Sequence, residues 1–88
     1  MKQREKKIIV RNRNGVHSRV ATKLAKIARK HAVRLYIIHC GQLIDCSSVL
    51  DVLGMAFVQG SSFVVRVDGE QPERALRAVE KLFARRDV

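Results

Sequence analysis

The chain has 88 residues, a hydrophobic fraction of 47% and a formal net charge of +10. This length suits a single domain over residues 1–88, and the apolar content suits a packed core rather than a disordered chain. No run approaches the roughly 20 uncharged apolar residues of a membrane helix, and the charged first residues lack the apolar region of a signal peptide. We therefore expect a cytoplasmic protein with no membrane insertion, and neither a multidomain enzyme nor a secreted disulfide scaffold.

The positive charge is concentrated in the first part of the chain. Residues 1–34 hold 12 of the 18 lysines and arginines but only one acidic residue, Glu5. Such a field attracts nucleic acid or an acidic protein surface. The four aromatic residues form no RNA-binding signature, and no zinc-finger spacing is present. Only the charge supports the alternative function of a small basic nucleic-acid-binding domain. We therefore expect no nucleic-acid partner.

The first half of the chain predicts a strand, a helix and two further strands. Residues 6–12 are rich in β-branched side chains and read as a strand. From Ser18 to about His31, apolar residues recur at helical spacing, and residues 33–39 and 43–44 follow as strands. The apolar positions of the helix are Val20, Leu24, Ile27 and Ala28, and a basic stripe consists of Arg19, Lys23, Lys26 and Lys30.

The second half predicts a short helix, a strand and a last helix. Residues 45–55 suit a short helix whose first turn is capped by Ser47 or Ser48. Residues 63–67 alternate as a strand, and Pro72 fits the first position of the last helix. The buried stripe of that helix is predicted to be Ala75, Leu76, Val79, Leu82 and Phe83. The order βαββαβα predicts an α+β domain with helices on one face of a four-stranded sheet.

The two cysteines give no disulfide framework. Cys40 and Cys46 stand close together with His39, which on paper supplies three metal ligands. Their spacing matches no established zinc pattern, so we expect reduced, partly buried thiols and no metal.

One segment carries reactive chemistry. His17 lies between a turn that contains Gly15 and the start of the first predicted helix. The first N–H groups of a helix lack partners and its dipole is positive there, which favours a neutral imidazole with a nitrogen free to attack phosphorus. An attached phosphoryl group would face these N–H groups and the Arg19 guanidinium. The competing interpretation is a solvent-exposed histidine beside a helix cap.

Two segments resemble one family. Residues 14–22, Asn-Gly-Val-His-Ser-Arg-Val-Ala-Thr, are similar to the phosphorylation-site pattern of HPr, the histidine-containing phosphocarrier family of the bacterial phosphoenolpyruvate-dependent sugar phosphotransferase system. Residues 41–53 resemble the family's stretch from its hairpin glycine to its regulatory serine and short helix, and Gly60 falls at a family turn. The resemblance covers nearly the whole chain and implies one HPr-like domain, an open-faced β-sandwich with an antiparallel sheet.

The resemblance also implies a function. The chain would be a phosphocarrier without a cofactor, which receives a phosphoryl group from enzyme I and passes it to enzyme IIA domains, rather than a stand-alone enzyme. A monomer is the base expectation. By position, His17 is the phosphoacceptor at Nδ1 and Arg19 stabilises the phosphate. The other phosphate-binding positions are Asn14, Gly15 and Ser18, and the partner-docking positions are Lys23, Lys26, Val49 and Leu50. Ser48 matches the serine that a regulatory kinase phosphorylates in some bacteria.

Some positions depart from the family pattern. Val20 replaces a proline in the first helical turn, which makes the helix start less rigid. Ser18 replaces an alanine and brings a hydroxyl that could cap the helix or donate to phosphate. Asp51 adds a carboxylate that would repel a phosphate on Ser48, so we favour helix capping as the role of Ser48. Val20 supports the alternative of a regulatory HPr-like module, either in a nitrogen-type phosphorelay or without transfer activity.

Overall fold

The computed structural model describes residues 2–88, and its elements follow the predicted order βαββαβα. The strands are β1 (Lys2–Ile9), β2 (Arg34–His39), β3 (Gln42–Asp45) and β4 (Ser62–Gly69). The helices are α1 (Ser18–Lys30), α2 (Val49–Gly54) and α3 (Pro72–Ala84). The last helix begins at Pro72 as predicted, because proline lacks only an N–H that has no partner in the first turn.

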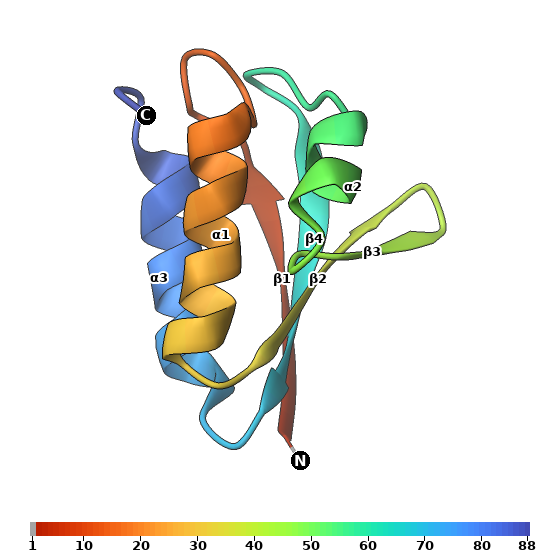
Figure 1. The fold of residues 1–88 in the computed structure, drawn as a ribbon, viewed down its shortest axis with the longest axis vertical. Coiled ribbons are helices and arrows are strands. Elements are labelled where there is room, and N and C mark those ends of the chain that lie inside the picture. The colour runs from red at the N-terminus through yellow and green to blue at the C-terminus, as the bar shows by residue number, and fades with distance from the viewer. Residues whose placement is uncertain (1) are drawn as a thin grey trace.

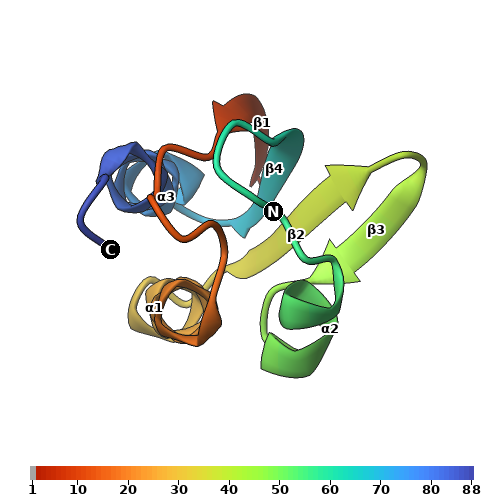
Figure 2. The same cartoon turned by 90° about the horizontal axis from the view of Figure 1, so that it is seen from above.

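The four strands form one antiparallel sheet in the order β1-β4-β2-β3. All three helices lie on one side of this sheet, and its other face is open (Figures 1 and 2). Along β4, Phe63, Val65 and Val67 are buried while the residues between them are half-buried. This alternation turns one row of side chains toward the helices. The predicted open-faced α+β sandwich is therefore confirmed.

The core lies between the sheet and the helices. In α1, Val20 and Leu24 have no exposed surface, and α3 contributes Val79 and Phe83 from its predicted stripe. Aromatic rings connect the layers: Phe57 packs on Phe63 with ring centroids 4.7 Å apart, and Phe63 packs edge-on against Phe83 at 5.3 Å. Such pairs add to the stabilisation from burial alone.

The first strand lies earlier in the chain than the sequence predicts. The prediction covered residues 6–12, whereas β1 covers Lys2–Ile9 and pairs along its whole length with β4. One further backbone hydrogen bond continues this register beyond β1, from the Val10 N–H to the Ser61 carbonyl at 2.9 Å. Residues 2–7 are exposed on an edge strand, where charged side chains are common, so their sequence lacks the apolar pattern that predicts a strand.

The predicted capping of the short helix is wrong in its chemistry. Ser48 occupies the N-cap position of α2, but neither its hydroxyl nor that of Ser47 caps the helix. Instead, Asp45 Oδ1 accepts hydrogen bonds from the Ser47 N–H at 2.9 Å and the Ser47 hydroxyl at 2.8 Å. The Asp45 side chain therefore organises the turn that leads into α2.

The two thiols differ in their environments. Cys40 is exposed in the β2–β3 hairpin with φ +49°, and Cys46 has no exposed surface. The expectation of two partly buried thiols is therefore wrong, because the hairpin carries Cys40 away from the core.

Candidate functional site

His17 forms the start of α1. It is the N-cap residue, with extended backbone angles (φ −88°, ψ −176°), and its imidazole Nδ1 accepts a hydrogen bond from the Arg19 N–H at 3.3 Å. Its carbonyl accepts from the Ala21 N–H at 3.0 Å. The cap is thus the histidine ring itself, and the expectation that Ser18 could cap the helix is wrong, because Ser18 is already the first helical residue.

The segment before His17 is held against another loop. Gly15 has φ +67°, and a Cβ atom there would lie 2.3 Å from the Phe57 carbonyl oxygen. The neighbouring Val16 N–H donates to the same oxygen at 2.9 Å. Only glycine permits both the left-handed backbone and this close approach. The position of His17 is therefore set by packing against residues 57–58, far away in the sequence.

Asn12 anchors the same segment to the end of α3. Its side chain has no exposed surface, and Nδ2 donates to the carbonyls of Leu82 at 2.9 Å and Arg85 at 2.7 Å. The Arg13 N–H donates to the Arg86 carbonyl at 3.1 Å. The sequence indicated only a turn at Asn12, because its partners lie 70 and 73 residues later.

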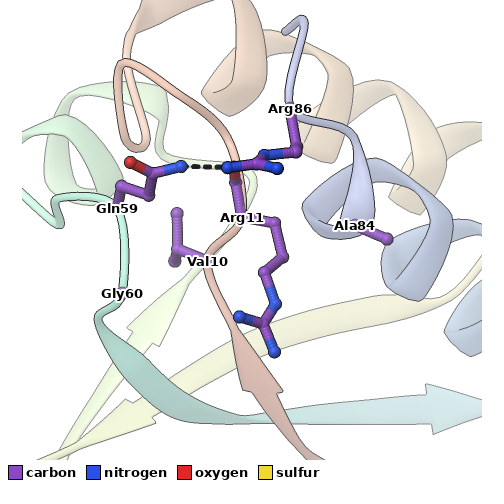
Figure 3. A pocket seen from close by; sticks show the side chains of 6 residues that line it. All are labelled: Val10, Arg11, Gln59, Gly60, Ala84 and Arg86. Atoms are coloured by element: carbon purple, nitrogen blue, oxygen red, sulfur yellow. Dashed lines mark hydrogen bonds between the residues drawn. The ribbon is translucent and has the colours of Figure 1, made fainter.

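These contacts define what we call the loop end of the molecule. It consists of the β1–α1 connection, the α2–β4 connection and the residues after α3, which gather at the top of Figure 1. A hollow of about 620 Å³ lies there, and Figure 3 shows its lining by Val10, Arg11, Gln59, Gly60, Ala84 and Arg86. The Gln59 amide donates to the Arg11 carbonyl at 3.1 Å, which braces two connections. No predicted phosphate-binding residue lines this hollow.

The predicted phosphate-binding residues surround the first turn of α1. His17 is half-buried, whereas Asn14, Ser18 and Arg19 are exposed. Among residues 2–88, Arg19 forms no ion pair within 4.0 Å, so its guanidinium is free to meet an anion. The arrangement combines a ring nitrogen, backbone N–H groups and a positive charge at one helix terminus, which suits a phosphoryl group.

The predicted docking residues line three different grooves. Lys23 and Lys26 lie on the side of α1 that faces α3. Val49 lines a groove on the opposite side of α1, together with Arg29. Leu50 is 80% exposed on α2 and lines a third groove, between α2 and β3. Sequence reasoning missed Arg29, because it lies outside the basic stripe and only the position of α2 reveals its neighbours.

Ser48 lies at the start of α2, where the turn and the helix already carry negative charge. Its backbone carbonyl accepts from the N–H groups of Asp51 and Val52, both at 3.1 Å, and its side chain is half-buried. Two carboxylates, Asp45 and Asp51, belong to the same turn and helix. This surrounding charge disfavours a second anion there.

The described residues 2–88 contain neither a cluster of metal-ligating side chains nor a membrane-spanning helix. No group of three or more His, Cys, Asp or Glu side chains in this range could hold a metal ion. None of the helices described there has both the length and the apolar character that a membrane crossing requires.

Fold and site together define a class: an open-faced α+β sandwich that presents a histidine at the amino end of its first helix. A phosphocarrier protein HPr of Xylella fastidiosa strain 9a5c is 32% identical over 82 residues, which cover 93% of this chain and 92% of that protein. One of Cupriavidus necator is 30% identical over 86 residues, covering 98% and 94%. The crystal structure of HPr from Bacillus anthracis superposes with a TM-score of 0.84 at 22% identity, over 94% of this chain and 99% of that one.

The family described as PTS HPr component phosphorylation site matches residues 4–85. The chain therefore belongs to the PTS HPr family. This membership confirms the phosphocarrier role that the sequence predicts.

Proposed function

We propose that His17 carries the phosphoryl group, at Nδ1, between phosphorylated enzyme I and an enzyme IIA domain. The observation that supports this most directly is the hydrogen bond from the Arg19 N–H to His17 Nδ1 at 3.3 Å. A nitrogen that accepts a hydrogen bond holds a lone pair, so the proton of the neutral ring is on Nε2. The lone pair needed for attack on phosphorus is therefore on Nδ1.

The transfer step is a displacement at phosphorus. The Nδ1 lone pair of neutral His17 forms the new N–P bond while the N–P bond of a protonated phosphohistidine on enzyme I breaks. The electron pair of the broken bond returns to the donor ring, which leaves as neutral imidazole, and His17 becomes the phosphoimidazolium with its proton on Nε2. No other co-reactant is needed, and transfer to enzyme IIA is the same step in reverse roles.

The residues around His17 would stabilise the phosphoryl group. Once Nδ1 is bonded to phosphorus, the Arg19 N–H loses its acceptor and is free to donate to a phosphoryl oxygen. The Arg19 guanidinium adds charge-assisted hydrogen bonds, and the exposed Ser18 hydroxyl is a further donor. Val20, in place of the family's proline, adds one more N–H in the first turn. Asn14 and Gly15 shape the connection that presents the ring.

Docking of the partner proteins would use the α1–α2 side of the molecule. Leu50 is 80% exposed, and Val49, its neighbour in α2, lines a groove with Arg29. Aliphatic side chains on α2 and a cation on α1 suit a small, quickly released contact, which a carrier needs.

The test is phosphorylation with purified enzyme I and phosphoenolpyruvate. We expect the intact mass to rise by one phosphoryl group and the phosphorus NMR spectrum to show an Nδ1-linked, acid-labile phosphohistidine. His17→Ala should remove the label, and His31→Ala, at the other end of α1, is the matched control that should keep it. A label that persists in His17→Ala, or an Nε2-linked product, would contradict the assignment.

A further inference from the structure

A groove between α1 and α3 collects cations above an apolar floor. Its volume is about 340 Å³, and it is lined by Lys23, Lys26 and Ile27 of α1 with Ala78, Lys81, Leu82 and Arg85 at α3. The lining is almost entirely carbon, because lysine side chains lay their methylene stems along the floor and keep the charges outside. The two helices lie side by side and run in opposite directions (Figures 1 and 2).

Three of the four cations on this rim lack partners among the described residues 2–88. Among residues 2–88, Lys23, Lys26 and Lys81 form no ion pair within 4.0 Å. Arg85 pairs with Asp87 at 3.1 Å. Hydrogen bonding and charge from Arg85 lower the pKa of the exposed Asp87 carboxyl, and the charge of Lys23 acts in the same direction. A carboxylate is thus already stabilised at one end of the groove.

We propose that the α1–α3 groove is a second docking surface, which binds an acidic amphipathic helix of a partner protein. Aliphatic side chains of that helix would fill the apolar floor, and its glutamates or aspartates would face Lys23, Lys26 and Lys81. Two antiparallel helices offer a ready groove for a third helix, as in helix-in-groove recognition.

The shape and lining select this occupant. The groove is at the small end of the range for small-molecule pockets and opens along two helices of 13 residues each, so a segment of about 20 Å fits better than a compact ligand. Nucleic acid would gain from the cations but would leave the floor uncovered, because its backbone offers phosphates and not aliphatic groups. An acidic amphipathic helix satisfies both features.

This surface lies apart from His17, although two of its cations, Lys23 and Lys26, are also positions that the sequence predicts to dock the phosphotransfer partners. It faces away from Val49, which lines the groove on the other side of α1. The inference therefore does not depend on the role of His17, and the two are tested by different measurements.

The probe is a helical peptide of about 14 residues with leucines at helical spacing and glutamates on both flanks. A scrambled peptide of the same composition is the control. We expect the helical peptide to shift the amide NMR signals of Lys23, Ile27, Ala78 and Lys81, with an affinity that falls as salt is added. The scrambled peptide should bind at least about tenfold more weakly, since it cannot present its leucines on one face.

Three variants distinguish binding in the groove from an effect of net charge. Lys81→Glu should weaken peptide binding by about tenfold or more. Arg77→Glu, the same charge change on the same helix but outside the groove, should change binding by less than about threefold. Ala78→Glu, which puts a carboxylate into the floor, should also abolish binding while circular dichroism shows a folded chain. All three should retain phosphorylation by enzyme I.

Three results would overturn the inference. The first is equal loss of binding in Lys81→Glu and Arg77→Glu, which would reduce the effect to net charge. The second is peptide-induced shifts confined to α2 or the loop end. The third is equal or tighter binding of a single-stranded RNA of about 12 nucleotides at the same residues, which would assign the groove to nucleic acid.

Discussion

The imidazole Nδ1 of His17 accepts its hydrogen bond from the backbone N–H of Arg19, at 3.3 Å, and not from a side chain. Arg19 therefore contributes in two separable ways: its N–H orients the ring, and its exposed guanidinium is free for a phosphate. Substitution of the side chain leaves the first contribution in place and removes the second.

We accordingly expect Arg19→Ala to lower kcat/KM for phosphorylation by enzyme I by about tenfold to a hundredfold, the cost of one or two charge-assisted hydrogen bonds. Arg19→Lys should recover only part of the loss, because an ammonium lacks the planar fork. Arg13→Ala, an exposed arginine in the connection before α1, is the control in steady-state assays. Equal losses in Arg13→Ala and Arg19→Ala would show that only net charge matters.

Substitution of Gly15 should destabilise the fold, and substitution of Gly41 provides a matched comparison. Gly15→Ala should lower the free energy of unfolding by about 2 kcal/mol or more, because the new Cβ would meet the Phe57 carbonyl at 2.3 Å. Gly41 has a similar backbone conformation, φ +78°, but a Cβ atom there would have no heavy atom within 4 Å. Gly41→Ala should therefore lower the free energy of unfolding by only about 1 kcal/mol. Urea unfolding measures both. Equal costs would mean that the close approach to Phe57 does not matter.

The end of α2 offers a stabilising exchange. Ala56 has φ +52°, which strains any residue with a Cβ, whereas Gly54 is helical with open space around it. Ala56→Gly and Gly54→Ala should each raise the free energy of unfolding by about 0.5–1 kcal/mol, and the double variant by about the sum. Ala25→Gly, within α1, should lower it. Destabilisation by Ala56→Gly in denaturant unfolding would contradict the left-handed conformation.

Substitutions of Asn12 should lower the free energy of unfolding in an unusual order. Its Nδ2 donates to two carbonyls near the end of α3, while its Oδ1 has no partner. Asn12→Ala should cost about 2 kcal/mol through the lost hydrogen bonds. The nearly isosteric Asn12→Asp should cost more, about 3 kcal/mol, because a buried carboxylate would face those carbonyls. Asn14→Ala, at an exposed position, should change thermal unfolding little. Asp tolerated better than Ala would disprove the donor role.

The thiols predict a pH dependence. Burial, with the charge of Asp45 as a smaller cause, raises the pKa of Cys46 from 9.0 to about 12. The unfolded thiol loses its proton near pH 9 and the folded one does not, so this contribution to stability is complete below pH 9 and is lost as the pH rises toward 12. The loss is about 1.4 kcal/mol per pH unit at most.

Cys46→Ala should flatten the decline of stability above pH 9, and Cys40→Ala should not. In the native protein a thiol reagent should modify Cys40 rapidly and Cys46 only after unfolding, since Cys40 alone is exposed. Simultaneous modification of both thiols without denaturant would show that Cys46 is accessible.

Much of the fold can be predicted from local patterns in the sequence. The helical spacing of Val20 and Leu24, the alternation around Val65, and Pro72 at a helix start each involve neighbours within a few residues. The first strand is the exception: its charged, exposed residues have no periodicity, and only the eight-residue pairing with β4 defines it.

The sequence by itself determined the family, the order of the elements and the location of a histidine at the start of a helix, because these depend on short-range spacing and on local propensity. Tertiary structure alone decided that Gly15 must touch Phe57 and that Asn12 holds the end of α3. It also decided that Lys23 and Lys26 of the basic stripe lie on the side of α1 that faces α3. Each of these depends on contacts between residues far apart in the chain, which a local pattern does not encode.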